Sequence, residues 1–239
     1  MTHPSFSHEQ ALPSLKVTKD FLHSLEQYLV KRVVDASIVS QEEASKLLSI
    51  KIEDSLGSET VTSISQVTAS RFADSTSRIE VELATPYKPD GTRLRVRLNF
   101  SRGRLFSTLA ISATMPNARE LALGLKDGLL RMLEPQKTGH WIAHPISQVW
   151  GALFAGGVWI GYFLYQASGK EAYFPYLLGS FSLVLIYLFG MGSLRSYTVF
   201  DSRASERADK IWGWFIGGVA TFLLFGTLLT LFRRPLLGF

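Results

Sequence analysis

The chain has 239 residues, a formal net charge of +5 and no cysteine. Without cysteine it cannot form disulfides, thiolate metal sites or a cysteine nucleophile. The modest charge argues against a dedicated nucleic-acid binder, and no basic segment followed by an apolar run opens the chain, so no signal peptide is predicted.

The distribution of apolar residues divides the chain into two parts. Residues 1–12 are expected to form a tail, residues 13–135 a charged α+β domain and residues 136–145 a linker. Residues 146–239 contain three apolar blocks and are expected to form a separate membrane domain.

Two helices are predicted early in the domain. Apolar residues at helical spacing between Thr18 and about Val34 predict an amphipathic helix with Thr18 as its cap. A short second helix is expected to begin at Ser40, where Glu43, three residues later, completes a capping box.

The hydrophobic period then changes from 3.6 to 2, which predicts strands. Residues 48–52 and 79–83 alternate apolar and polar side chains, and the turn at 87–91 joins the second of these runs to residues 94–100. Another turn at 101–104 leads into a further strand. We therefore expect an antiparallel sheet of about four strands with helices on one face.

The turns also predict how these strands pair. In the first hairpin Glu82 is expected opposite Arg97, so that glutamates and arginines share one face of the sheet. In the second hairpin a tight turn over 101–104 would place Val96 opposite Leu109.

A final helix of the domain is predicted between Asn117, its expected cap, and Pro135, which ends it. Glu120 follows the cap at capping-box spacing. Gly124 and Gly128 lie four residues apart on one face, and a close packing contact is expected there, because glycine inside a helix otherwise only weakens it.

Three later segments contain no Asp, Glu, Lys, Arg or His: 146–166, 173–191 and 211–232. A helix needs about 20 mostly apolar residues to cross a hydrocarbon core of roughly 30 Å, and each segment has about that length. Trp and Tyr near the segment ends are typical of residues at membrane interfaces. We therefore expect three transmembrane helices.

Basic residues beside these segments predict an orientation. Lys and Arg are more numerous on the side shared by the N-terminal domain and the connection between the second and third segments. This bias favours a multi-pass protein of the plasma (inner) membrane with its N-terminal domain in the cytoplasm.

The connection over residues 192–210 has a pattern of its own. "SYTVF" is strand-like, and a polar stretch follows it. Its basic residues are candidates for contact with lipid headgroups, although a simple topological role is the favoured interpretation: Arg195, Arg203, Arg207 and Lys210.

Two further sets of residues are candidates for binding surfaces. Glycines at G-x-x-x-G spacing on the first and third apolar segments would let helices approach closely: Gly157, Gly161, Gly213 and Gly217. A row of arginines could bind nucleotides, RNA or anionic lipid, although cross-strand pairing with glutamates is the favoured interpretation: Arg93, Arg95, Arg97, Arg102 and Arg104.

Motifs for chemistry are scarce. "HWIAH" places His140 and His144 at a spacing that could hold a metal on a helix, but no third ligand is near and Pro145 disfavours a helix there. The chain has no nucleophile elbow, H-E-x-x-H or phosphate-binding glycine loop. No catalytic residue, metal site or cofactor is therefore predicted.

The favoured function is a non-enzymatic integral membrane protein whose cytosolic domain senses or docks a partner and whose three helices can oligomerise. A membrane effector or channel-like subunit and an enzyme at the membrane surface are the alternatives. The expected partners are membrane lipids and either a second copy of the chain or another membrane or cytosolic protein. A nucleic acid or nucleotide partner is disfavoured but stays open.

Overall fold

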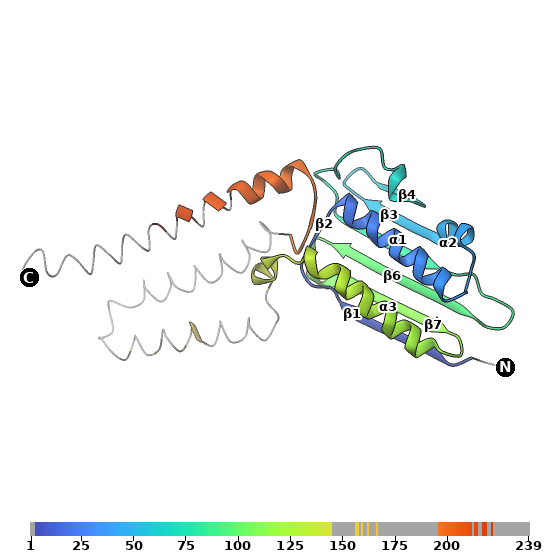
Figure 1. Ribbon diagram of the computed structural model, residues 1–239. Coiled ribbons are helices and arrows are strands. Elements are labelled where there is room, and N and C mark those ends of the chain that lie inside the picture. Colours follow the sequence, from blue (N-terminus) through green and yellow to red (C-terminus); the bar gives the residue numbers. More distant parts are fainter. Residues whose placement is uncertain are drawn as a thin grey trace, which may run out of the picture.

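The computed structural model describes these residues: 3–144, 156–157, 159, 162, 166, 196–211, 213–214, 217–218 and 221. The main body of this part of the chain is a six-stranded sheet (Figure 1). Its strands are β1 (Ser5–Ala11), β3 (Leu48–Glu53), β4 (Ser58–Val61), β5 (Arg78–Ala84), β6 (Arg93–Ser101) and β7 (Thr108–Thr114). They lie antiparallel in the order β1-β7-β6-β5-β3-β4.

The expected number of about four strands is too low. Strands β3, β5, β6 and β7 form the predicted meander, and β4 and β1 extend it by one strand at each border. The missed strand β1 lies within the segment expected to be a tail. Its residues on the core side are Phe6, His8 and Gln10, and two of them are polar, so β1 has no apolar alternation to reveal it.

Helices cover one face of the sheet: α1 (Lys19–Asp35), α2 (Gln41–Leu47) and α3 (Ala118–Leu133) (Figure 1). The caps of the first two are confirmed, because Thr18 Oγ1 accepts from the Phe21 N–H at 3.1 Å and both halves of the Ser40–Glu43 capping box are present. Asn117 is the N-cap residue of α3 as expected, but its side chain makes no capping hydrogen bond.

The described residues also contain four short 3₁₀ helices: η1 (Ile64–Gln66), η2 (Arg104–Phe106), η3 (Glu134–Gln136) and η4 (Gly139–Ala143). Of these, η2 changes a predicted register. It lengthens the loop between β6 and β7, so Val96 lies opposite Ile111 instead of Leu109. The shift is two residues and therefore leaves the same side chains facing the core. The other predicted pair, Glu82 opposite Arg97, is confirmed.

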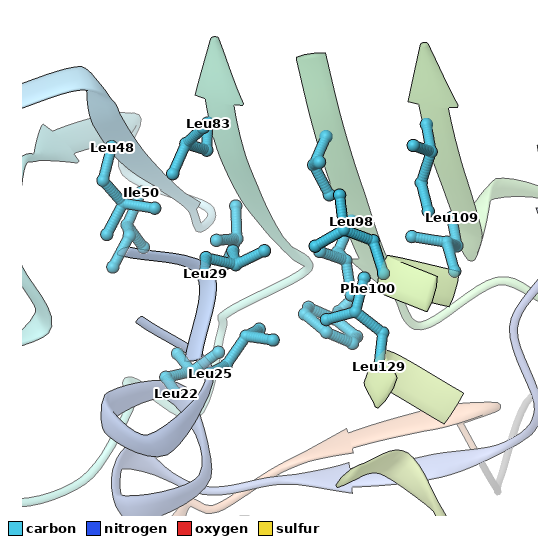
Figure 2. Close-up of a cluster of buried hydrophobic side chains, with 14 of the residues drawn as sticks. Leu22, Leu25, Leu29, Leu48, Ile50, Leu83, Leu98, Phe100, Leu109 and Leu129 are labelled. Carbon is cyan, nitrogen blue, oxygen red and sulfur yellow. The ribbon is translucent and has the colours of Figure 1, made fainter. Parts of the chain in front are cut away.

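The core lies between the helices and the sheet (Figure 2). Leu25 and Leu29 of α1 and Leu129 of α3 meet Leu98 and Phe100 of β6 there, and all five are fully buried. Burial of one such side chain stabilises the fold by about 1.5–3 kcal/mol, so this layer holds the two helices on the sheet.

Of the two glycines of α3, only Gly128 lies in a close contact. A Cβ atom at Gly128 would overlap the Tyr28 hydroxyl of α1 and lie 2.6 Å from Tyr28 Cζ. At Gly124 no atom of the described residues lies within 4 Å of such a Cβ. Of these two glycines, only Gly128 therefore lies where α1 and α3 approach each other closely.

The expected membrane domain is corrected by the structure. Among the described residues no helix is both long and apolar enough to cross a membrane. The helices α1 and α3 have 17 and 16 residues and each carries charged side chains, whereas a crossing needs about 20 mostly apolar residues. The three transmembrane helices, and the multi-pass plasma-membrane location with a cytoplasmic N-terminal domain that was inferred from them, are therefore not supported.

The positions of the three expected spans lie mostly outside the described residues. In 146–166 only five positions are described, in 173–191 none, and in 211–232 only the first residue and a few isolated ones. The membrane effector and the membrane-surface enzyme depended on the same spans, so they lose the support that those spans provided.

Candidate functional site

A second, two-stranded sheet joins the start of the domain to residues far along the chain. β2 (Leu15–Val17) pairs in parallel with β8 (Thr198–Phe200), which confirms the strand-like pattern of "SYTVF". Just before β8, Tyr197 is buried and donates its hydroxyl to the Leu12 carbonyl at 2.8 Å. Burial raises the pKa of Tyr197. Residues 196–202 therefore belong to the folded body.

The described segments on the two sides of residues 145–195 touch each other. His140 Nδ1 lies 3.1 Å from the Ser196 carbonyl oxygen. The rings of His144 and Tyr197 pack edge to face, with centroids 5.5 Å apart. The residues just before position 145 and those just after position 195 thus meet at one place. We call this place the junction, and define it as residues 138–144 together with residues 196–202.

A pocket of about 230 Å³ opens at the junction. It brings together stretches of chain that are far apart in sequence: the loop before β5, the end of β6, η4, and the segment from β8 onward. Its charged and hydroxyl side chains include Asp74, Arg102, His140, Ser202, Ser205 and Asp209. The pocket therefore offers groups of both charge signs within one small volume.

Asp74 connects the loop before β5 to a helix that begins after β8. Residues 203–211 are helical, and Asp74 Oδ1 accepts from the Ala204 N–H in the first turn at 2.9 Å. This backbone hydrogen bond is the largest cause that lowers the pKa of Asp74, and the positive charges of Arg203 and Arg207 lower it further. A carboxylate at this position also complements the positive end of the helix dipole. The Asp74 carbonyl in turn accepts from Arg102 Nη2 at 2.5 Å.

The same helix has a reciprocal cap. The Ser202 N–H donates to Ser205 Oγ at 3.1 Å, and the Ser205 N–H donates to Ser202 Oγ at 3.2 Å. One turn on, Glu206 forms ion pairs with Arg71 at 2.8 Å and with Lys210 at 3.2 Å. Hydrogen bonds from Arg71 and then Lys210 lower the pKa of Glu206. The wall of the pocket formed by residues 203–211 is thus tied to the domain by polar contacts.

The predicted basic surface is divided between two places. On the uncovered face of the sheet, Arg95 and Arg97 form ion pairs with Glu82 at 2.6 and 3.0 Å, and Arg97 also pairs with Glu80 at 2.9 Å. Burial opposes ionisation of Glu82, but hydrogen bonds from the two arginines outweigh it and lower its pKa. Arg93 is exposed at the start of the same strand.

The other two arginines of the predicted basic surface, Arg102 and Arg104, lie beside the junction. Arg102 lines the pocket, and Arg104 Nη1 donates to the His144 carbonyl at 2.8 Å. The five arginines are therefore divided between β6, which ends at Ser101, and the loop that follows it. Four of the five make contacts with other described residues of the chain: Arg95, Arg97, Arg102 and Arg104.

The other predicted positions either lie outside the described residues or are not among the described residues that line the pocket. Gly161 and Arg195 are outside the described residues. No atom of the described chain lies within 4 Å of a Cβ built at Gly157, Gly213 or Gly217. Three basic residues expected to contact lipid headgroups lie on the 203–211 helix: Arg203, Arg207 and Lys210. Helix packing at these glycines and lipid contact at these basic residues stay predictions.

Metal chemistry has no candidate in the part of the chain that the structure describes, where no three or more His, Asp or Glu side chains gather. His140 and His144 are instead used at the junction. The prediction that the chain has no metal or cofactor stays untested.

Sequence reasoning did not identify Asp74, Ser202, Ser205 or Asp209 as site residues. The S-x-x-S spacing of the two serines is a helix-start signal that could have been found. Asp74 has no such signal, because its contact with Ala204 joins residues 130 positions apart.

Comparison of the chain with protein-family models, with curated proteins and with solved structures finds no match. The function is therefore argued from the geometry alone. The pocket is small and polar, and it lies where the segments before and after residues 145–195 meet. It can bind a ligand that carries groups of both charge signs, and such a ligand would contact both segments at once.

Proposed function

We propose that the chain is a non-enzymatic sensing protein whose α+β domain binds a small polar ligand in the junction pocket. The observation that carries this proposal is the composition of the pocket wall. His140 lies before residues 145–195, Ser202 and Asp209 lie after them, and Asp74 and Arg102 belong to the domain. A molecule in the pocket would contact all three parts.

The size and charge of the pocket support a particular class of ligand. A volume of about 230 Å³ is below the range of roughly 300–1,000 Å³ typical of sites for drug-sized ligands. Arg102 offers a cation, Asp209 an anion, and the serines neutral hydrogen-bonding groups. A small zwitterion, such as a free amino acid, matches these groups better than a nucleotide or a purely apolar molecule.

Sensing requires that the ligand distinguishes two states of the protein, because a ligand shifts an equilibrium only by its differential affinity. The junction supplies a physical basis for such a difference. The contact between His140 and Ser196 and the hydrogen bond from Ala204 to Asp74 are separate small contacts, each able to open locally. A ligand that bridges them favours the state in which both are closed.

The first test is ligand binding to the full chain. We expect glycine or glutamate, at millimolar concentration, to raise the thermal unfolding temperature more than succinate, inorganic phosphate or AMP does. Asp209→Asn should remove this increase, whereas Asp127→Asn, an exposed change on α3, should preserve it. The pocket assignment is wrong if no zwitterion stabilises the protein, or if Asp209→Asn responds like wild type.

The second test concerns the response. The chain has no cysteine, so Trp141→Cys with Ile211→Cys gives two exposed positions for spin labels, one in η4 and one at the end of the 203–211 helix. A bound ligand should narrow the distribution of distances measured between the two spin labels. Binding with an unchanged distribution would leave a ligand site but no sensing, and turnover of a bound probe would show an enzyme.

A further inference from the structure

The outer border of β1 is a regular strand edge that no described residue covers. β1 is the first strand in the sheet order, and its register with β7 runs without a bulge from Ser5 to Ala11 (Figure 1). Edge strands are commonly protected by lysine, by a bulge or by very short length. At the other border of the sheet, β4 is protected by its short length of only 4 residues. β1 has 7 residues, no lysine and no bulge, and its one residue with a formal charge at pH 7 is Glu9.

The hydrogen bonds to β7 determine which backbone groups of β1 point outward. The Leu12 N–H donates to the Ser107 carbonyl at 2.9 Å, and the Met115 N–H donates to the Pro4 carbonyl at 3.2 Å. In an antiparallel pair hydrogen bonding alternates along the strand, so the even-numbered residues of β1 bond to β7. The odd-numbered ones therefore direct their N–H and C=O groups away from the sheet: Ser5, Ser7, Glu9 and Ala11.

We propose that β1 pairs antiparallel with β1 of a second copy of this chain, with the two-fold axis at His8. His8 is the midpoint of Ser5–Ala11, so this register alone pairs every outward-facing residue of one copy with one of the other. It places Ser7 opposite Glu9 and Ser5 opposite Ala11. A two-fold register centred on Glu9 would instead oppose two carboxylates, which destabilises strand pairing.

Three observations favour a second copy over an unrelated strand. The only residue of β1 with a formal charge at pH 7, Glu9, meets a serine in this register. Pro13 is the next outward-facing position after Ala11 and has no N–H, so a longer partner strand gains no hydrogen bond from an N–H there. Three of the outward-facing residues, Ser5, Ser7 and Ala11, have small exposed side chains that do not obstruct an approaching strand. The pairing is independent of the junction pocket.

Disulfide trapping tests the register directly, because the chain has no other thiol. His8→Cys places the introduced thiol at the two-fold axis, in a non-hydrogen-bonded pair whose Cβ atoms are about 4.5–5.5 Å apart. The full chain should form a covalent dimer under mild oxidation. Gln10→Cys is the matched control on the same face, since its two copies would be four residues out of register, roughly 13 Å apart. Gln10→Cys should form at least tenfold less covalent dimer than His8→Cys.

Ser7→Pro tests the strand edge itself. It removes an outward N–H on each copy while leaving the hydrogen bonds of β1 to β7 intact, so circular dichroism should be unchanged. Sedimentation at increasing concentration should show a monomer–dimer equilibrium for wild type and a monomer for this variant.

The proposal is overturned if wild type stays monomeric, if Gln10→Cys is trapped as well as His8→Cys, or if the His8→Cys dimer survives the added Ser7→Pro. Should Ser7→Pro fail to fold, the comparison of the two cysteine variants still decides.

Discussion

Gly128 is the position where helix propensity and tertiary packing oppose each other. Replacing glycine with alanine inside a helix ordinarily stabilises it by about 1 kcal/mol. At Gly128 the new methyl group would overlap the Tyr28 hydroxyl and lie 2.6 Å from Cζ, so the ring must move. Overpacking of this kind costs about 1–3 kcal/mol. The Arg32 guanidinium, 5.4 Å from the ring centroid, would lose a cation–π contact of about 0.5–1 kcal/mol.

Gly128→Ala should therefore destabilise the protein by about 0.5–3 kcal/mol, because the overpacking and the lost contact outweigh the gain in propensity. Gly124→Ala is the matched control one turn earlier, where no described atom lies within 4 Å of the new methyl group. It should stabilise the protein by about 1 kcal/mol. The two variants should thus unfold at temperatures several degrees apart, at roughly 2–4 °C per kcal/mol.

Urea unfolding of the full chain, followed by far-UV circular dichroism, measures the difference. Amide hydrogen exchange in α1 and α3 shows whether the change in stability arises in these two helices. In a Tyr28→Ala background the obstructing ring is absent, and Gly128→Ala should then stabilise as Gly124→Ala does. Equal stabilisation by both glycine substitutions in the wild-type background would show that the helices do not depend on a close approach at Gly128.

Three further predictions concern the core, a cap and an ion pair. Leu25→Ala should cost about 2–5 kcal/mol in urea unfolding, whereas Leu56→Ala, at a side chain that is 94% exposed, should cost almost nothing; similar losses would contradict the assigned core. Ser40→Ala should cost about 1 kcal/mol and accelerate amide exchange in α2, and unchanged exchange would mean that the capping box does not hold this helix. Because the pKa of Glu82 is lowered below its ordinary 4.5, its contribution is present at neutral pH and is lost as the pH falls through the folded-state value. Urea unfolding between about pH 6 and pH 3 should show a smaller loss of stability in Glu82→Gln than in wild type, and parallel curves would remove the role given to the arginine pairs.

Local patterns explain most of what could be predicted of the fold. Helix α1 and the cap at Thr18 follow from residues within one or two turns, and the Ser40–Glu43 box spans three positions. The pairing of Glu82 with Arg97 follows from a hairpin whose turn lies between them. In each case the interacting groups are close in sequence, so the residue types and their spacing contain the necessary information.

The predictions that failed have more than one cause. The three apolar segments satisfied a length criterion, but that criterion does not establish the structure of the segments. β1 pairs with β7 across about a hundred residues and has polar side chains toward the core, so no periodicity identifies it.

The sequence by itself determined the helix starts, the strand alternation of the meander and the charge pairing on its uncovered face, because these arise from neighbours along the chain. Only the tertiary structure decided that Gly128 packs closely and Gly124 does not, that β8 returns to pair with β2, and that Asp74 and Arg102 line a pocket with His140 and Asp209. The physical reason is that such contacts join residues far apart in sequence, and their geometry is determined by how the whole core packs.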